Sequence, residues 1–121
     1  MICNDIIMSM KLPNRKNAIV KRRKLTHYLL DITHPVGKSK AVFFRGIGFD
    51  DTNLHLLEQG LYKIAQVNHI SNSRSSDDNS GINYMIIGSL NAPDGKIYSI
   101  EIVWYIKAGT QDPIFITAYP V

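Results

Sequence analysis

The segment from His34 to Lys40, with the sequence HPVGKSK, places one imidazole beside two ammonium groups in a short turn. A histidine has an ordinary pKa of about 6.5, so it can take or give a proton near neutral pH. Ammonium groups such as those of Lys38 and Lys40 stabilise the negative charge that develops when a phosphate reacts. The turn is therefore a candidate site for chemistry on phosphates. A solvated surface histidine is the equally weighted alternative for His34.

The basic residues are concentrated in the first part of the chain. From Lys11 to Arg45 there are ten lysines or arginines and one acid, Asp31, although the net charge of the whole chain is only +4. Such an asymmetry gives one surface that attracts polyanions. The candidate phosphate contacts are Arg22, Arg23, Lys24, Lys38 and Arg45. A charge run often only faces solvent, and that interpretation stays open for these residues.

Other chemistries lack the residues that they need. The only cysteine is Cys3, so a disulfide framework or cysteine-rich zinc site is excluded and a reducing, cytoplasmic location is expected. The histidines have no metal-site spacing. Lys38-Ser39-Lys40 lacks the glycines of a P-loop, and Gly46-x-Gly48 is too short for a dinucleotide fingerprint. We therefore expect no metal or cofactor. The apolar runs are also too short to span a membrane.

Hydrophobic spacing predicts helices in the first half of the chain. After a frayed lead-in over residues 1–10, a single domain is expected from residue 11 to 121. Its helices are expected at about 22–31, 38–45 and 52–66. The residues predicted to face inward are Leu25, Tyr28, Leu29, Ile32, Ala41, Val42, Phe44, Leu54, Leu57, Leu61 and Ile64. The side chains of Asp50 to Asn53 are expected to cap the third helix.

The second half has the two-residue period of β-strands. Residues 68–81, rich in Ser, Asn and Asp, are predicted to form a mobile loop. Strands are then expected at 83–90, 97–106 and 114–119, joined by short turns that make neighbours antiparallel. Trp104 alternates with the apolar residues of its strand and is expected on the core face. Helices followed by strands predict an α+β fold with an antiparallel sheet of three to four strands.

Two polar residues near the end of the last predicted strand complete the candidate site. Thr117 and Tyr119 are two positions apart, so on a strand they share a face. That face holds a hydroxyl and a phenol ring near each other, where a phosphate and a base could be bound. Packing of Tyr119 in the core is the simpler alternative.

A set of short motifs runs along the chain: Leu12-Pro13-Asn14, Lys24-Leu25, Tyr28-Leu29-Leu30, His34-Pro35, Gly37, Lys40-Ala41, Phe44, Val103-Trp104-Tyr105-Ile106, Pro113 and Thr117-Ala118-Tyr119. These motifs resemble a family of small bacterial domains that is classed as of unknown function, and the resemblance covers nearly all of residues 11–120. That family also occurs as a carboxy-terminal module of larger secreted or phage-borne proteins. The layout, with helices before an antiparallel sheet, and the final TAYP pattern are also similar to the barnase–EndoU–RelE superfamily of ribonuclease toxins.

The resemblance implies metal-independent cleavage of RNA by attack of the ribose 2′-hydroxyl on the adjacent phosphate. It implies that His34 is the general base or acid, that Lys40 is the cation on the non-bridging oxygens and that Thr117 binds phosphate. Tyr119 would orient or stack a base, with Lys38 and Arg45 in support. The chain departs from the superfamily in one respect. Many members carry an arginine or histidine on a sheet strand, whereas Glu101 is the only charge inside the predicted strands.

Two functions of different class therefore compete. The first is a ribonuclease toxin whose partners are RNA and a small antitoxin or immunity protein encoded next to it. The second is a non-catalytic basic module that binds nucleic acid or an acidic protein. Both predict binding that weakens with salt, and only the first predicts turnover.

Overall fold

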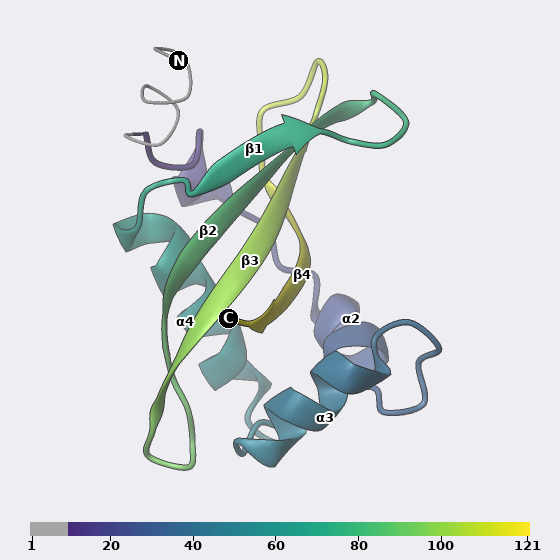
Figure 1. Ribbon diagram of the computed structural model, residues 1–121, viewed down its shortest axis with the longest axis vertical. Helices are drawn as coiled ribbons and strands as arrows, with labels where there is room; N and C mark the ends of the chain where they lie inside the picture. Colours follow the sequence, from purple (N-terminus) through teal and green to yellow (C-terminus); the bar gives the residue numbers. More distant parts are fainter. Residues whose placement is uncertain (1–9) are drawn as a thin grey trace.

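Four antiparallel strands form one sheet in the order β1-β2-β3-β4. They are β1 (Asn72–Ser75), β2 (Gly81–Asn91), β3 (Ile97–Lys107) and β4 (Ile114–Pro120). All helices precede the sheet along the chain (Figure 1). This confirms the predicted α+β fold and the three strands expected after the helices.

The computed structural model describes residues 10–121. Cys3 and nearly all of the expected lead-in therefore lie outside the described residues. At Met10, the first described residue, the main-chain carbonyl accepts a hydrogen bond of 2.7 Å from the Ile70 N–H. Within residues 10–121, no helix is both long and apolar enough to cross a membrane.

The first predicted helix is present but is built in two parts. A short turn η1 (Arg15–Asn17) precedes α2 (Arg22–Lys24), which continues into the π-helical turn η2 (Leu25–Leu29). The Leu30 N–H donates to the Leu25 carbonyl at 2.8 Å, a step of five residues. Leu25 and Leu29 are buried as predicted. The inward placement of Ile32 is wrong: it is 50% exposed, because the helix ends before it.

The second and third predicted helices are α3 (Lys38–Gly46) and α4 (Leu54–Val67). Most of their predicted inward residues are buried, but Val42 is 55% exposed and its predicted inward position is wrong.

The side-chain cap expected at the start of α4 is absent. Asn53 takes the N-cap position without a capping bond to the helix, and its Oδ1 instead accepts from the Asp50 N–H. These side chains stabilise the preceding turn, where their short acceptors find closer donors.

Strand β1 lies inside the segment that was predicted to be a loop. Its sequence, NSRS, has no apolar alternation, and it is held by antiparallel pairing with Ile82–Met85 of β2. The prediction of a continuous loop over 68–81 is therefore wrong in this stretch. Hydrogen bonds between main chains do not require apolar side chains, so hydrophobic spacing could not detect β1.

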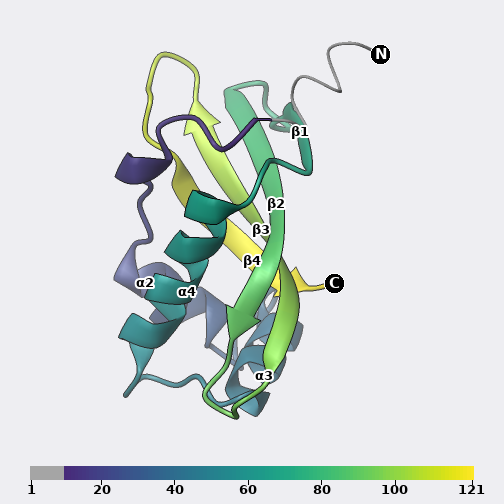
Figure 2. The same cartoon turned by 90° about the vertical axis from the view of Figure 1, so that its left-hand side faces the viewer.

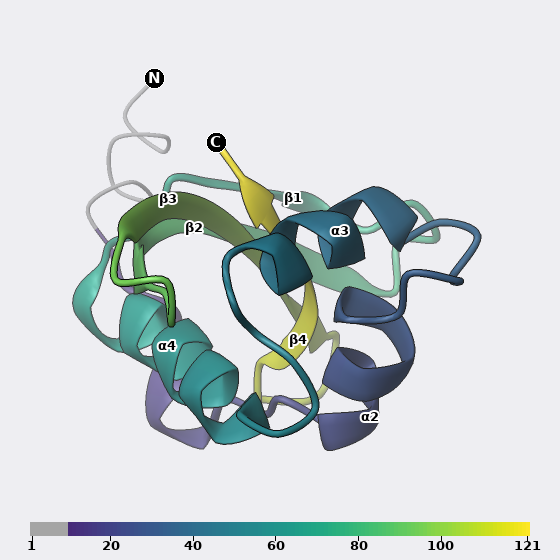
Figure 3. The ribbon, with the colours of Figure 1, turned by 90° about the horizontal axis from the view of Figure 1, so that it is seen from below.

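The core lies between one face of the sheet and the helices. Helix α4 runs along that face beside β2 (Figure 2), and α2 and α3 lie together near β4 (Figure 3). Trp104 is fully buried there, as predicted, between Tyr62 and Phe115. An isolated parallel bridge between Ile19 and Ile114 attaches the chain before α2 to the start of β4. This bridge holds the first helices against the last strand.

Candidate functional site

The face of the sheet opposite Trp104 carries the polar residues of the last two strands. Thr117 and Tyr119 of β4 pair with Val103 and Glu101 of β3, and Ala118 between them is buried in the core. Thr117 and Tyr119 therefore share the outer face, as the two-residue spacing predicted. Both are half-buried.

Tyr28 connects the helical part of the site to this face. Its hydroxyl is 2.8 Å from the Thr117 hydroxyl, and the two share a hydrogen bond. The His34 ring meets the Tyr28 ring edge to face, with 5.1 Å between centroids, and the Lys24 Nζ lies 4.5 Å from the Tyr28 ring centre. Tyr28 thus gathers its sequence neighbours Lys24 and His34 and the distant Thr117 around one ring.

The turn that carries His34 is closed by the histidine itself. Its Nδ1 accepts hydrogen bonds from the Val36 N–H at 3.1 Å and the Gly37 N–H at 3.0 Å. Because Nδ1 is an acceptor, the proton of the neutral ring lies on Nε2, which can donate to a ligand. Gly37 permits the close approach, since a Cβ there would lie 2.9 Å from the Tyr28 ring. The sequence and the fold therefore fix both the position and the tautomer of His34.

Tyr119 is hydrogen-bonded to a carboxylate. Its hydroxyl donates to Glu101. Burial, followed by this bond and the negative charge of Glu101, raises the pKa of Tyr119 to about 12, while the positive charge of Arg74 opposes the shift. The phenol thus stays protonated at physiological pH. It occupies one oxygen of Glu101 and leaves the other as an acceptor on the outer face.

The predicted cations are placed unequally. Arg22, Arg23 and Lys38 are exposed, whereas Lys40 is half-buried and makes no hydrogen bond or ion pair within residues 10–121. Lys38 lies beside a shallow hollow that includes Val36 and Val42. Convergence of Lys38 or Lys40 on Thr117 thus stays a prediction.

Arg45 is held within the fold. Its Nε donates to the Leu30 carbonyl at 2.5 Å, and its Nη2 lies 3.3 Å from the Asp51 carboxylate. These contacts connect α3 to the end of η2 and favour a structural role for this guanidinium. Its role as a phosphate contact stays a prediction.

Three residues of the site were not assigned by sequence reasoning. Helical spacing placed Tyr28 in the core, although a tyrosine among leucines signals a position that reaches a polar neighbour. Arg74 was hidden in the segment predicted as a loop, yet it is a cation on strand β1. The sequence identified Glu101 as the only charged residue inside the predicted strands but indicated no role for it.

The acidic and imidazole groups are dispersed. Within residues 10–121, no group of three or more histidines, cysteines or acidic residues is arranged to hold a metal ion. The groups around Tyr28 are the imidazole N–H of His34, the hydroxyls of Tyr28 and Thr117, and the ammonium group of Lys24. This is a set of groups suited to binding a phosphate and its ribose.

Comparison with known proteins supports the fold. The structure is similar to a chain of the contact-dependent growth inhibition toxin–immunity protein complex from Klebsiella pneumoniae 342, with a TM-score of 0.64 and 19% sequence identity. The similarity covers 88% of this chain and 95% of that chain. No curated protein matches the sequence. Residues 11–121 match the family described as domain of unknown function DUF6883, and the chain therefore belongs to that family.

Proposed function

We propose that this chain is the toxic domain of a growth-inhibition system and that it cleaves RNA. The observation that carries the proposal is the convergence of His34, Lys24 and Thr117 around Tyr28. An imidazole, an ammonium group and two hydroxyls at one place can bind the ribose-phosphate backbone. The similarity to a chain of a toxin–immunity complex supports the toxin role.

The proposed reaction is a transesterification within the RNA strand. The 2′-oxygen forms a bond to the adjacent phosphorus, and the bond from phosphorus to the 5′-oxygen of the next nucleotide breaks. The products are a 2′,3′-cyclic phosphate and a free 5′-hydroxyl. The open oxygen of Glu101 takes the proton of the 2′-hydroxyl, and water supplies the proton to the leaving 5′-oxygen. The chain supplies the base and water supplies the acid, so the proposed route uses no metal ion.

In this proposal the side chains around Tyr28 bind the reacting phosphate. The Nε2–H of His34 donates to a non-bridging oxygen, and Lys40 and Lys24 supply positive charge that stabilises the transition state. Thr117 donates to the same phosphate, and Tyr119 positions a base on the sheet. A proton-transfer role for His34, the prediction from sequence, requires Nδ1 first to lose the two N–H donors of the turn.

The proposed partners are RNA and a protecting protein. The exposed Arg22 and Arg23 extend the positive surface beyond the site and can bind flanking phosphates. A toxin in a growing cell also needs a protein that neutralises it. The similar structure from Klebsiella pneumoniae 342 contains an immunity protein, and we propose that this chain has a partner of the same kind.

The test is cleavage of RNA by purified protein in EDTA, with the cyclic phosphate identified by mass spectrometry. Wild type should cleave, and His34→Ala and His34→Asn should be inactive while binding RNA nearly as well as wild type. His34→Asn is the sharper variant, because an asparagine oxygen can accept the two N–H bonds of the turn. His27→Ala is the matched control, since His27 is an exposed imidazole on η2, close to His34 in the sequence but outside its turn.

A non-catalytic basic module is the second candidate, and the exposed arginines of α2 favour it. It predicts salt-sensitive RNA binding without product. Full cleavage by His34→Asn would reduce His34 to a structural residue of the turn and would contradict the assigned role. Absence of cleavage across cellular RNA by wild type would favour the binding module.

A further inference from the structure

Beyond the end of β1, the outer edge of β2 has no strand beside it. β1 pairs only with residues Ile82–Met85, whereas β2 continues to Asn91. In an antiparallel sheet, alternate residues direct their N–H and C=O groups to opposite neighbours. The residues of β2 from Ile86 to Asn91 therefore direct half of their main-chain groups away from β3. No other segment within residues 10–121 pairs with them.

Three hydrogen bonds identify which groups face outward. The Ser76 N–H donates to the Gly81 carbonyl and the Ser71 N–H to the Met85 carbonyl, so odd-numbered residues of β2 face β1. On the other side, the Ala92 N–H donates to the Lys96 carbonyl, so even-numbered residues face β3. The main-chain groups of Ile87, Ser89 and Asn91 thus continue the row that β1 uses, with no hydrogen-bond partner within residues 10–121.

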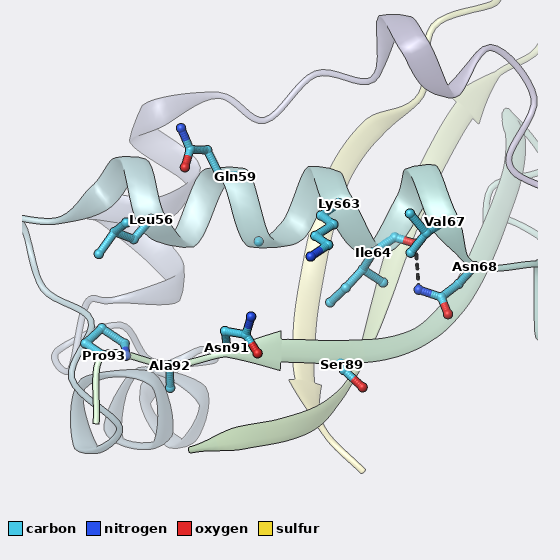
Figure 4. A pocket seen from close by; sticks show the side chains of 11 residues that line it. Leu56, Gln59, Lys63, Ile64, Val67, Asn68, Ser89, Asn91, Ala92 and Pro93 are labelled. Atoms are coloured by element: carbon cyan, nitrogen blue, oxygen red, sulfur yellow. Dashed lines mark hydrogen bonds between the residues drawn. The ribbon is translucent and has the colours of Figure 1, made fainter. Parts of the chain in front are cut away.

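A groove runs along this edge between β2 and α4 (Figure 4). Its volume is about 530 Å³, and one wall carries Leu56, Gln59, Lys63 and Val67 of the helix. Two glycines let the helix approach the strand closely. A Cβ at Gly88 would lie 2.5 Å from the Asn68 side chain and 2.7 Å from Ile64. A Cβ at Gly60 would lie 2.4 Å from Leu90.

We propose that this groove receives an extended strand from a separate protein, which adds to the sheet beside β2. Only an extended polypeptide repeats N–H and C=O groups at the two-residue spacing offered by Ile87, Ser89 and Asn91. The exposed edge lacks two common forms of protection, since Ile86–Asn91 contains no proline and no charged residue.

The helix wall specifies the side chains of the incoming strand. Leu56 and Val67 are 43% and 57% exposed, so they offer apolar contact at the two ends of the groove. Lys63 lies between them and is the one charged residue of the lining (Figure 4). The partner strand is therefore apolar on the side facing α4, with a carboxylate opposite Lys63. This inference is independent of the proposed RNA cleavage.

The experiment uses the full chain and an acetylated peptide in which valine alternates with threonine and the central residue is glutamate. Nuclear magnetic resonance should show saturable binding below about 1 mM, a range expected for a short added strand. Hydrogen exchange at the amides of Ile87, Ser89 and Asn91 should slow on binding. The amides of Gly88 and Leu90 are the internal controls, because they face β3 and should be protected already.

Two variants test the assigned contacts. Ser89→Pro removes an outward N–H without touching the bonds to β3, and it should abolish binding. Lys63→Glu should weaken the glutamate peptide by roughly two- to fivefold and favour a lysine peptide by a similar factor, as for an exposed ion pair. Circular dichroism establishes whether each variant is folded.

An N-methylated peptide keeps the test decisive if Ser89→Pro does not fold. Methyl groups on the amides that face β2 remove their donors and should abolish binding. Equal binding of the methylated and parent peptides would overturn the proposal. So would the absence of saturable binding at about 1 mM, or peptide protection of amides on β4 instead of β2.

Discussion

The hydroxyl pair of Tyr28 and Thr117 is the smallest unit on which the proposed site depends. It connects a helical turn to the last strand, with partners 89 positions apart. Neither side chain is fully buried, so the bond stabilises the fold only modestly. Its larger effect is on geometry, because the Tyr28 ring also positions His34 and Lys24.

We expect Tyr28→Phe and Thr117→Val to be coupled. Each removes one hydroxyl with little change in shape, and the double variant should lose less stability than the sum of the two. The expected coupling is about 0.5–1.5 kcal/mol, the usual range for one hydrogen bond. Urea unfolding of the four proteins measures it. Strictly additive losses would mean that the two hydroxyls do not bond in solution.

Ionisation of Tyr119 should make the stability of the fold depend on pH. Its pKa is raised in the fold to about 12 from an ordinary value of 10.0, so its protonated form is favoured by folding. The resulting stability is fully present below pH 10.0 and is lost as the pH rises through about 12. Phenolate absorbance should show a late step that becomes smaller by the absorbance of one tyrosine in Tyr119→Phe, because the hydrogen bond to Asp94 also raises the pKa of Tyr98. Glu101→Gln should lower the pKa only in part, because burial is the larger cause. A late step of unchanged amplitude in Tyr119→Phe would contradict this assignment.

At the scale of elements, the contact between α4 and β2 depends on small residues. Gly88→Ala places a methyl group against Asn68 and Ile64, and we expect a loss of about 1–3 kcal/mol from overpacking. Gly46→Ala is the matched control, since nothing lies within 4 Å of a Cβ at this helix position. It should be neutral or stabilising by up to about 1 kcal/mol. Thermal unfolding compares the two, and equal effects would argue against close packing at Gly88.

Trp104 should dominate the stability of the sheet. It is fully buried between α4 and β4, so Trp104→Ala removes a large apolar volume. The expected loss is about 3–5 kcal/mol in the free energy of unfolding. Denaturant titration followed by circular dichroism measures it, and an unchanged midpoint would contradict the core assignment. Its Nε1 has no hydrogen-bond partner within residues 10–121, so Trp104→Phe should lose much less.

The elements differ in how far the sequence could predict them. Helix α4 and strand β3 were predictable because their apolar residues repeat with a helical or a two-residue period. Strand β1 was not, since its NSRS sequence is stabilised by the main chain of β2. For the site, His34 and Thr117 stood out by residue type. Tyr28 did not, because its hydroxyl contact depends on tertiary packing that a helical period cannot describe.

At the scale of the whole molecule, the positive charge is concentrated in the helical part of the chain, where it can attract a polyanionic ligand. The part of the chain up to Val67 carries 11 of the 14 lysines and arginines, whereas the 10 acids are divided equally between that part and the rest of the chain. In the proposed function, such a distribution would orient an RNA strand toward the helices and the edge of β4. A protein that adds a strand at β2 would bind at another edge of the same sheet, next to α4.

This arrangement predicts which cations set the salt dependence of RNA binding. Arg22→Gln and Arg23→Gln should each reduce the slope of log affinity against log salt by about 1, if each contacts one phosphate. Lys107→Gln, an exposed cation at the end of β3, is the control and should leave the slope unchanged. Fluorescence anisotropy with a short labelled RNA measures the slopes. An equal effect of all three variants would indicate general charge attraction instead of a defined surface.

The bond between Tyr28 and Thr117 also has a consequence during synthesis of the protein. A ribosome makes Tyr28, His34 and Lys24 early, but Thr117 follows much later, and the bridge from Ile19 to Ile114 also waits for β4. Until β4 has left the ribosome, the nascent chain has neither the outer face nor the partner that holds Tyr28 in place. If the proposed activity is correct, the ribosome that makes this toxin is not exposed to a working site while the chain is still growing.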